Sequence, residues 1–405
     1  MRKILTAFTL ILCLAMLFGL AGCDNGASSE AKSSSEEPSE PEGPVSIAKE
    51  DIKVGVLHIT DPDEGAGYTF AHDQGIVAMQ SALGLADNQI VRQNNVDDKD
   101  KSAIKTATEA LLASGCNVIF ATSWGFMDTI EEMANEYPEV YFSHGTGYKY
   151  NETNFNNYFG RIYQARYLTG IAAGLKTESN KLGYVAAYGT DLAETCSGIN
   201  AFALGAQAVN PDVEVFVKVV GKWFDPVKET SFAEALLEMD CDVIAQHCDT
   251  ANPQTAAEKA GKFGCGYNSD MTVQAPAAHL TAPIWNWGVY YTKAVQAVID
   301  GKWAELGNYY GDINDGLIDI SPLSDNCAPN TAEYIQQVKD LFKEGTWDVF
   351  SGVALSFGDD GKLIKTDKVL LDASGMEIAS EGGPSVSDGV ITGEMDYYVL
   401  GVYED

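Results

Sequence analysis

Apolar residues recur along this chain in two alternating patterns from about residue 52 onward. A short run rich in β-branched residues at 52–59 predicts a buried strand, and apolar positions at helical spacing over 70–85 predict a helix. The same unit repeats, with strands expected at 89–96, 117–122 and 140–144 and helices at 101–113 and 126–136. Strands that alternate with helices predict a parallel sheet covered on both faces.

A second series of the same kind follows residue 160. Its expected helices lie at 161–176, 194–209, 226–239 and 253–260, and its expected strands at 181–188, 213–220, 242–247 and 262–267. A strand at 279–287 and a helix at 288–299 predict a return to the first series. A further helix is expected at 331–343, and short strands with Gly-rich turns at 350–405.

These patterns predict an α/β protein with two doubly wound parallel-sheet lobes and a hinge, in the form of a clamshell. Lobe 1 is expected to hold residues 51–158 and about 286–312. Lobe 2 is expected to hold residues 159–285 and, with the C-terminal segment, about 313–405. In such folds the ligand cleft lies at the carboxyl ends of the strands, and the hinge closes around a small molecule.

The N-terminal segment has the layout of a lipoprotein signal peptide, predicted for residues 1–22. Arg2 and Lys3 precede an apolar run at 4–20, and Leu20-Ala-Gly-Cys23 matches a lipobox, in which the Cys23 thiol receives lipid. The run is shorter than the ~20 residues that a single-pass anchor needs. Residues 23–50 are rich in Ser, Glu and Pro, which predicts a disordered tether. We therefore expect an extracytoplasmic protein, lipid-anchored to the bacterial cell membrane.

The net charge bears on the binding partners, and the cysteine content bears on metal sites and disulfides. The chain has 58 acidic and 26 basic residues and a net charge of −32, which argues against binding to nucleic acid. Six cysteines follow the lipobox, at positions 116, 196, 241, 248, 265 and 327, without zinc-site spacing. We expect most of them to be small buried hydrophobic residues, although six cysteines allow 15 disulfide pairings.

Candidate ligand-binding residues lie where predicted strands end. They are Tyr68, Trp124, Trp223, His247, Asp270 and Trp285. Aromatic rings and hydrogen-bonding groups in these loops suit a planar ligand with a polar edge. Each residue also has a structural alternative: the Trp223 segment, for example, could simply begin a helix, with Asp225 as N-cap before Pro226.

Several long motifs in order resemble the basic membrane protein (BMP) family of ABC-importer substrate-binding lipoproteins. The resemblance covers residues 52–304, with weaker similarity to the C-terminal side. It rests on Tyr68-Thr-Phe-Ala-His-Asp-Gln-Gly75, Thr146-Gly-Tyr-Lys149, Tyr158-Phe-Gly-Arg-Ile-Tyr-Gln-Ala-Arg-Tyr167, Trp223-Phe-Asp-Pro226, Asp242-Val-Ile-Ala-Gln-His247 and Gly266-Tyr-Asn-Ser-Asp-Met271. It implies a type I periplasmic-binding-protein-like fold.

The resemblance also implies a function. Known members bind purine nucleosides or bases; the position that stacks on the purine falls on Tyr68, and the Asp that contacts ribose or base falls on Asp270. Nucleoside-binding members carry Lys where this chain has Trp285, which favours a free base. The expected partners are a small-molecule purine and ABC permease subunits, and the expected protein is a monomer without cofactor, metal or catalytic activity.

Three alternatives stay open from the sequence. A receptor of the same fold could bind a sugar, or could signal occupancy to a membrane partner instead of a permease. The third is a nucleoside hydrolase, because Asp61, Asp63 and Glu64 cluster in the loop after the first strand. No Gly-x-Ser-x-Gly, His-Glu-x-x-His or Walker motif is present.

Overall fold

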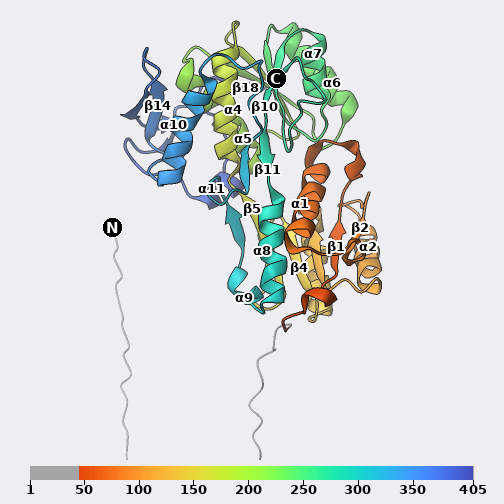
Figure 1. Cartoon of the computed structure of the whole chain (residues 1–405). Coiled ribbons are helices and arrows are strands. Elements are labelled where there is room, and N and C mark those ends of the chain that lie inside the picture. The colour runs from red at the N-terminus through yellow and green to blue at the C-terminus, as the bar shows by residue number, and fades with distance from the viewer. Residues whose placement is uncertain (1–44, 405) are drawn as a thin grey trace, which may run out of the picture. The chain divides into compact units, whose positions relative to one another are not determined.

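Six parallel strands form the sheet of lobe 1, in the order β12-β5-β4-β3-β1-β2. The computed structural model describes residues 45–404. The strands are β1 (Val54–Leu57), β2 (Ile90–Gln93), β3 (Val118–Ala121), β4 (Tyr141–Gly145), β5 (Phe155–Gly160) and β12 (Tyr309–Gly311). The helices are α1 (Gly67–Leu83), α2 (Lys101–Ala113), α3 (Met127–Glu136), α8 (Trp287–Ile299) and α9 (Trp303–Leu306), in the lower part of Figure 1.

A second sheet of six parallel strands forms lobe 2, in the order β10-β9-β8-β6-β7-β18. Its strands are β6 (Lys181–Ala186), β7 (Glu214–Val219), β8 (Val243–His247), β9 (Phe263–Cys265), β10 (His279–Thr281) and β18 (Val402–Glu404). Its helices include α4 (Ile162–Lys176), α5 (Ala193–Val209), α6 (Pro226–Glu238) and α7 (Asn252–Lys259). The predicted pair of parallel-sheet lobes is confirmed, and both lobes belong to one compact unit.

Local sequence explains most of these elements. Every residue of β1, β3 and β8 is buried, because helices cover both faces of each sheet. Strands β1 and β3 therefore read as continuous apolar runs, whereas β8 ends in the polar Gln246 and His247. Asp100 caps α2 by accepting hydrogen bonds from the N–H groups of Ser102 and Ala103. Asp225 caps α6 in the predicted way, directly before Pro226.

Within residues 45–404 the chain passes between the lobes three times. The first passage leads from β5 to α4, the second from β10 through β11 (Pro283–Trp285) to α8, and the third from β12 to β13 (Ile318–Ile320). Strands β11 and β13 pair with each other in antiparallel register. The division into lobes at residue level, at 158, 285 and 312, stays a prediction.

One predicted element is wrong. The single strand expected at 279–287 is two strands, since β10 belongs to the sheet of lobe 2 and β11 pairs with β13. The N–H of Ala282 donates to Ser321 Oγ, and Pro283 has no N–H, so the pairing with β9 ends at Thr281.

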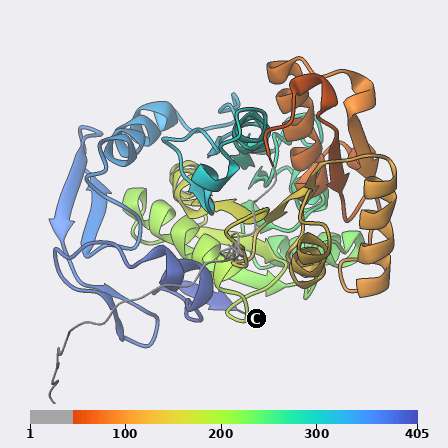
Figure 2. The same ribbon diagram turned by 90° about the horizontal axis from the view of Figure 1, so that it is seen from below.

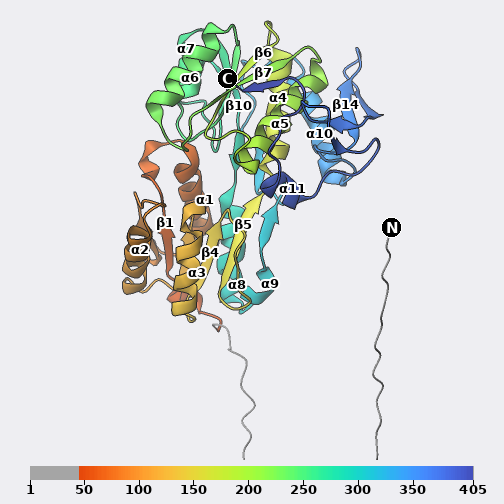
Figure 3. The same ribbon diagram turned by 180° about the vertical axis from the view of Figure 1, so that it is seen from behind.

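The C-terminal segment adds structure to lobe 2 on the side away from β2 and α2 (Figures 2 and 3). It contains α10 (Thr331–Glu344), the hairpin of β14 (Val353–Phe357) and β15 (Leu363–Asp367), the pair β16 (Leu370–Leu371) and β17 (Glu377–Ala379), and α11 (Asp388–Gly393). Helix α10 packs on α4, and β14 and α11 pack on α5. The expected short strands with glycine-rich turns are present.

The short 3-10 helices are η1 (Lys49–Asp51), η2 (Pro62–Glu64), η3 (Asp87–Gln89) and η4 (Trp124–Phe126).

Residues 45–50 end the predicted tether, yet Ile47 packs on the lobe 1 core and its N–H donates to Val298 O at 3.3 Å. The ordered body therefore begins before residue 51. The predicted signal peptide, Cys23 and most of the tether lie outside the described residues.

All six cysteines of the described chain are free, and five of them are buried, which confirms that most act as small hydrophobic residues. Burial raises the pKa of the Cys116 thiol to about 11 and of the Cys196 and Cys241 thiols to about 12. Among residues 45–404, no helix is both long and apolar enough to cross a membrane.

Candidate functional site

The two lobes meet at the start of α1. Gly67 has φ +88°, and a Cβ at this position would lie 2.1 Å from the carbonyl oxygen of Asp249 in lobe 2. Nearby, Gln274 of lobe 2 donates to Gly65 O of lobe 1 at 3.1 Å. A side chain at position 67 would push the lobes apart, so this contact requires glycine.

Tyr68 follows Gly67 and turns its ring toward the lobe boundary. The ring packs edge-on against His72 at 4.3 Å and against Trp287 at 6.2 Å between centroids. Its hydroxyl is buried and has no hydrogen-bond partner within residues 45–404. Burial first, then Tyr158, then Glu194, Tyr267 and Asp249 raise the pKa of Tyr68. The last three belong to lobe 2, so Tyr68 lies within electrostatic reach of that lobe.

Lobe 2 presents a carboxylate and an imidazole to this boundary. Glu194 lies in the first turn of α5, where the helix dipole favours a negative charge. Its Oε1 lies 3.1 Å from Nε2 of the buried His247. Burial, with a further contribution from Arg166, lowers the pKa of His247 to about 4. The imidazole is therefore neutral at pH 7 and donates from Nε2 to the Glu194 carboxylate.

Tyr267 and Arg166 lie behind this pair. The Arg166 guanidinium carbon lies 3.8 Å from the Tyr267 ring centroid, and Arg166 donates to Gln246 O. Its Nε and second terminal nitrogen have no hydrogen-bond partner within the described chain. A buried guanidinium whose N–H donors have no partner carries a large desolvation cost. A polar ligand that accepts from these donors would lower this cost.

Asn268 and Asp249 complete the lobe 2 wall. Asn268 has φ +69° and donates to Asp249 Oδ1 at 3.0 Å, while its own Oδ1 is buried without a partner within the described chain. The N–H of Asp249 donates to Trp223 O at 2.9 Å. The Trp223 ring lies 5.9 Å from that of His247. Three loops thus contribute here: the Trp223 indole lies next to His247, and Asn268 is held by Asp249 with its amide oxygen unused.

Stacked rings link the two lobes at the second passage. Trp285 stacks on Trp287 with centroids 4.3 Å apart and planes 11° apart, and Trp287 stacks on His72 with the same values. The Trp285 indole N–H donates to Tyr267 OH at 3.4 Å. Trp285 is therefore packed in the hinge region, with its single donor already used.

We call the following set the interlobe site: Tyr68, Trp287 and Tyr310 from lobe 1 with Glu194, His247, Asp249, Tyr267 and Asn268 from lobe 2. Tyr310 is included because its buried hydroxyl has no partner among the described residues, and because Glu194, after burial and Asp388, contributes to its raised pKa. The site combines aromatic rings, the carboxylates of Glu194 and Asp249 and one amide oxygen. Such groups bind planar molecules that carry N–H donors.

The six residues expected from the sequence fall into two groups. Tyr68 and His247 belong to the interlobe site, and Trp223 and Trp285 contact it. Trp124 is 51% exposed at a loop tip next to Tyr148, with 6.1 Å between their rings. The Asp270 side chain is 45% exposed, accepts hydrogen bonds from Thr272 and lies 3.4 Å from His279. No described contact of Asp270 or Trp124 reaches the interlobe site.

Sequence reasoning did not single out Glu194, Arg166 or Tyr310. It also did not name four site residues that lie near predicted ones in the chain: Trp287, Asp249, Tyr267 and Asn268. Glu194 begins a helix after a predicted strand, which is the same signal that identified Tyr68, and this signal could have found it. Arg166 gives no such signal, because it lies inside a helix and reaches Tyr267 only through the packing of α4 on the sheet. Within residues 45–404 no group of His, Cys, Asp and Glu side chains is arranged to hold a metal ion.

A family model described as ABC transporter substrate-binding protein PnrA-like matches residues 52–348. The chain belongs to this family. Membership implies a small-molecule ligand, permease partners and a place outside the cytoplasm. The resemblance to the BMP family read from the sequence motifs is confirmed.

Two curated relatives differ in the ligand that their names carry. This member of the PnrA-like family is 34% identical over 310 residues to a purine-binding protein of Brucella abortus, covering 76% of this chain and 86% of that protein. It is 35% identical over 274 residues to a putative ABC transporter glucose-binding protein of Haloferax volcanii, covering 68% of this chain and 66% of that protein.

Solved structures share the fold of this PnrA-like protein at low identity. A solute-binding protein of an ABC transporter system from Aeropyrum pernix has a TM-score of 0.61 at 17% identity, covering 76% of this chain and 93% of that chain. A transcriptional activator of the comK gene from Bacillus halodurans has a TM-score of 0.62 at 23% identity, covering 73% and 99%. These likenesses bear on the fold alone.

Proposed function

We propose that this protein captures a purine base or nucleoside at the interlobe site and delivers it to an ABC permease. The observation that carries the proposal is Tyr68, an aromatic side chain of lobe 1 with an unused hydroxyl, facing Glu194, Tyr267 and Asp249 of lobe 2. The purine-binding relative supports the choice of ligand, because it matches 76% of this chain.

The chemistry of a purine suits these groups. Its ring faces stack on aromatic side chains such as Tyr68, at ~1–3 kcal/mol per base. Its ring or exocyclic N–H groups would donate to the carboxylate of Glu194 and to the Oδ1 of Asn268, and its ring nitrogens would accept from the hydroxyl of Tyr310. Each of these groups, from both lobes, would then hold the closed form together.

We further propose that the free base binds at least as well as its nucleoside. Trp285 stands where nucleoside-binding family members have Lys, and its indole N–H already donates to Tyr267. It therefore offers no charged donor to a ribose hydroxyl, and a buried hydroxyl without a partner costs about 1–3 kcal/mol. The exposed Asp270 is the remaining candidate for a ribose contact.

The anchor and the partners complete the proposal. Cys23 carries the lipid after removal of the signal peptide, residues 24–44 tether the protein to the cell membrane, and the mature protein acts as a monomer. It binds no nucleic acid, in keeping with its net charge of −32. It has no catalytic activity and needs no cofactor.

Calorimetry with one protein preparation tests the ligand. Adenine, hypoxanthine, adenosine and inosine are compared with glucose, and we expect saturable binding of the purines only. Glucose binding without purine binding would replace the proposal with the sugar receptor that the Haloferax relative suggests. Nucleosides that bind tenfold tighter than their bases in both pairs would overturn the base preference. Free hypoxanthine released from inosine would reveal a hydrolase.

A further inference from the structure

A cavity of about 520 Å³ lies in lobe 2 beside the hinge, separate from the interlobe site. Four segments line it: the start of α4, the loop after β12, the segment from the end of α10 into β14, and residues 382–385. This volume falls in the range of small-molecule sites, about 300–1,000 Å³. We call it the hinge cavity.

Part of its wall lies beyond the region that matches the family. The family model ends at residue 348, whereas Ser351, Val353 and residues 382–385 all line the cavity. The C-terminal segment thus closes a space over α4 that the family-matching region alone leaves incomplete. The hinge cavity therefore depends on residues beyond the region that matches the family, and none of its lining residues belongs to the interlobe site.

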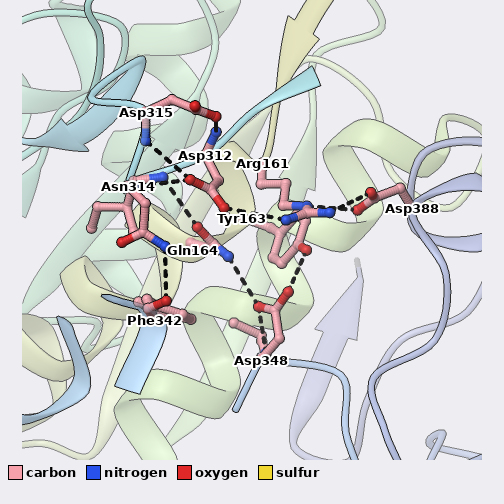
Figure 4. A network of polar contacts seen from close by, with 11 residues as sticks. Arg161, Tyr163, Gln164, Asp312, Asn314, Asp315, Phe342, Asp348 and Asp388 are labelled. Atoms are coloured by element: carbon pink, nitrogen blue, oxygen red, sulfur yellow. Dashed lines mark hydrogen bonds and ion pairs between the residues drawn. The ribbon is translucent and has the colours of Figure 1, made fainter. Parts of the chain in front are cut away.

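Carboxylates outnumber cations in the wall. Arg161 forms a two-pronged ion pair with Asp388, at 2.9 and 2.7 Å, and contacts Asp312 at 3.3 Å (Figure 4). Its charge is therefore already offset by two carboxylates. A third carboxylate, Asp348, forms no ion pair among the described residues. The wall carries an excess of negative charge.

Asp348 is held in place by neutral donors. Its Oδ2 accepts from Tyr163 OH at 2.8 Å, and its Oδ1 accepts from Gln164 Nε2 at 3.3 Å (Figure 4). Burial raises the pKa of Asp348 above its usual value, against a hydrogen bond from the Val349 N–H at 2.8 Å, the two bonds from Tyr163 and Gln164, and the more distant Arg161. A cation inside the cavity would relieve this cost, because it would pair with a buried carboxylate that has no ion-pair partner among the described residues.

Two hydroxyl groups of the wall are buried without a partner within the described chain, those of Ser351 and Ser385. Ser351 is only 7% exposed. Each hydroxyl can accept a hydrogen bond from an ammonium N–H. Trp347 also lines the cavity, and the face of a tryptophan ring attracts cations.

From these groups we propose that the hinge cavity is a second ligand site, which binds a small organic amine in its protonated form. The ammonium group pairs with Asp348 and donates to the hydroxyls of Ser351 and Ser385. The proposal does not depend on the ligand of the interlobe site.

Putrescine is the probe, and 1,4-butanediol of the same length is its neutral counterpart. Both are titrated into the full chain by calorimetry at constant ionic strength, so that screening of the acidic surface is held fixed. We expect saturable binding of putrescine and none of the diol. Equal binding of both, or no saturable heat from putrescine, overturns the proposal.

Variants locate the site. Asp348→Asn keeps the shape: its Oδ1 accepts from Gln164 and the Val349 N–H as before, and its amide N–H donates to the Tyr163 hydroxyl. We expect it to weaken putrescine binding by about tenfold or more. Asp325→Asn removes the same charge at an exposed position outside the cavity and should leave binding unchanged. Equal loss in both variants would show non-specific attraction to the acidic surface. Ser351→Ala, which removes a hydroxyl without a partner within the described chain, should weaken binding without loss of stability.

Two further measurements separate the outcomes. Mg²⁺ titrated in place of putrescine tests for a metal site, and Mg²⁺ binding that depends on Asp348 would overturn the choice of an amine. Purine binding should survive in Asp348→Asn, because this residue is no part of the interlobe site. Failure of the purine proposal would therefore leave the amine result intact, and the reverse also holds.

Discussion

Gly67 and Asp249 touch across the lobe boundary, and the contact leaves no room for a methyl group. A Cβ at position 67 would lie 2.1 Å from the backbone oxygen of Asp249, and backbone cannot rotate away as a side chain can. The closed arrangement of the lobes therefore depends on a single glycine at the start of α1. Because hinge closure retains the ligand in this fold class, the contact links a local backbone feature to affinity.

Gly67→Ala should open the lobes and weaken purine binding by about tenfold or more, since the closed state gives up its closest contact. The positive φ at this position should also lower the free energy of unfolding by about 1 kcal/mol. Gly65→Ala is the matched control, because Gly65 has φ +75° but no atom within 4 Å of its Cβ position. Calorimetry on both variants separates strain from closure; equal affinities would show that the 67–249 contact does not control binding.

Tyr68→Ala should weaken purine binding by ~1–3 kcal/mol, the usual loss for one base–aromatic stack. Tyr68→Phe keeps the ring and removes only the hydroxyl, so a loss confined to Tyr68→Ala would assign the energy to stacking. Tyr148→Ala removes an aromatic ring that is 65% exposed and should have no effect. If Tyr68→Ala binds as tightly as the parent protein, the ligand lies elsewhere.

Stability should fall as the pH falls from about 6.5 toward 4. Burial lowers the pKa of His144, His247 and His279 to about 4, and that of His72 well below its usual value. Between pH 6.5 and 4 these histidines are protonated in the unfolded chain but neutral in the folded protein. Acid therefore favours unfolding, by up to about 3 kcal/mol for a histidine whose pKa falls from 6.5 to about 4.

Urea unfolding of His144→Gln at several pH values tests this dependence. The variant should lose stability less steeply than the parent between pH 6.5 and 4, because one of the four histidines with a lowered pKa is gone. His144 is suited to the test, since its Nε2 contacts only Ser123 O, at 2.7 Å, among the hydrogen bonds of the described chain. An unchanged slope would show that His144 titrates normally in the folded protein.

Cys23→Ser should prevent lipid attachment and release the protein from the membrane fraction, because a serine hydroxyl replaces the thiol that receives the lipid. Labelled palmitate is the readout. Cys327→Ser, which alters a free thiol in the body, should still be labelled. Palmitate that persists in Cys23→Ser would refute the assignment of the lipobox.

Regular elements were predictable because their signals are local. The helix expected at 101–113 has the same bounds as α2, where Asp100 supplies the cap, and the helix after Asp225 and Pro226 begins where expected. Short strands whose partners lie far away in the chain were not predictable. Strand β12 has three residues and pairs with β5, about 150 positions earlier in the chain, and no pattern of three residues specifies such a partner.

The interlobe site divides in the same way. The sequence by itself determined the two α/β lobes, the order of their elements and the loops that hold Tyr68 and His247. The hydrophobic period and the ends of strands depend on residues that are neighbours in the chain. Only the tertiary structure decided that Asp270 bonds within its own loop, that the Trp285 indole N–H donates to Tyr267, and that Arg166 of α4 packs on the Tyr267 ring. The direction of a side chain at the lobe boundary depends on packing between segments that are far apart in the chain. The pattern of residues along the sequence does not specify this packing.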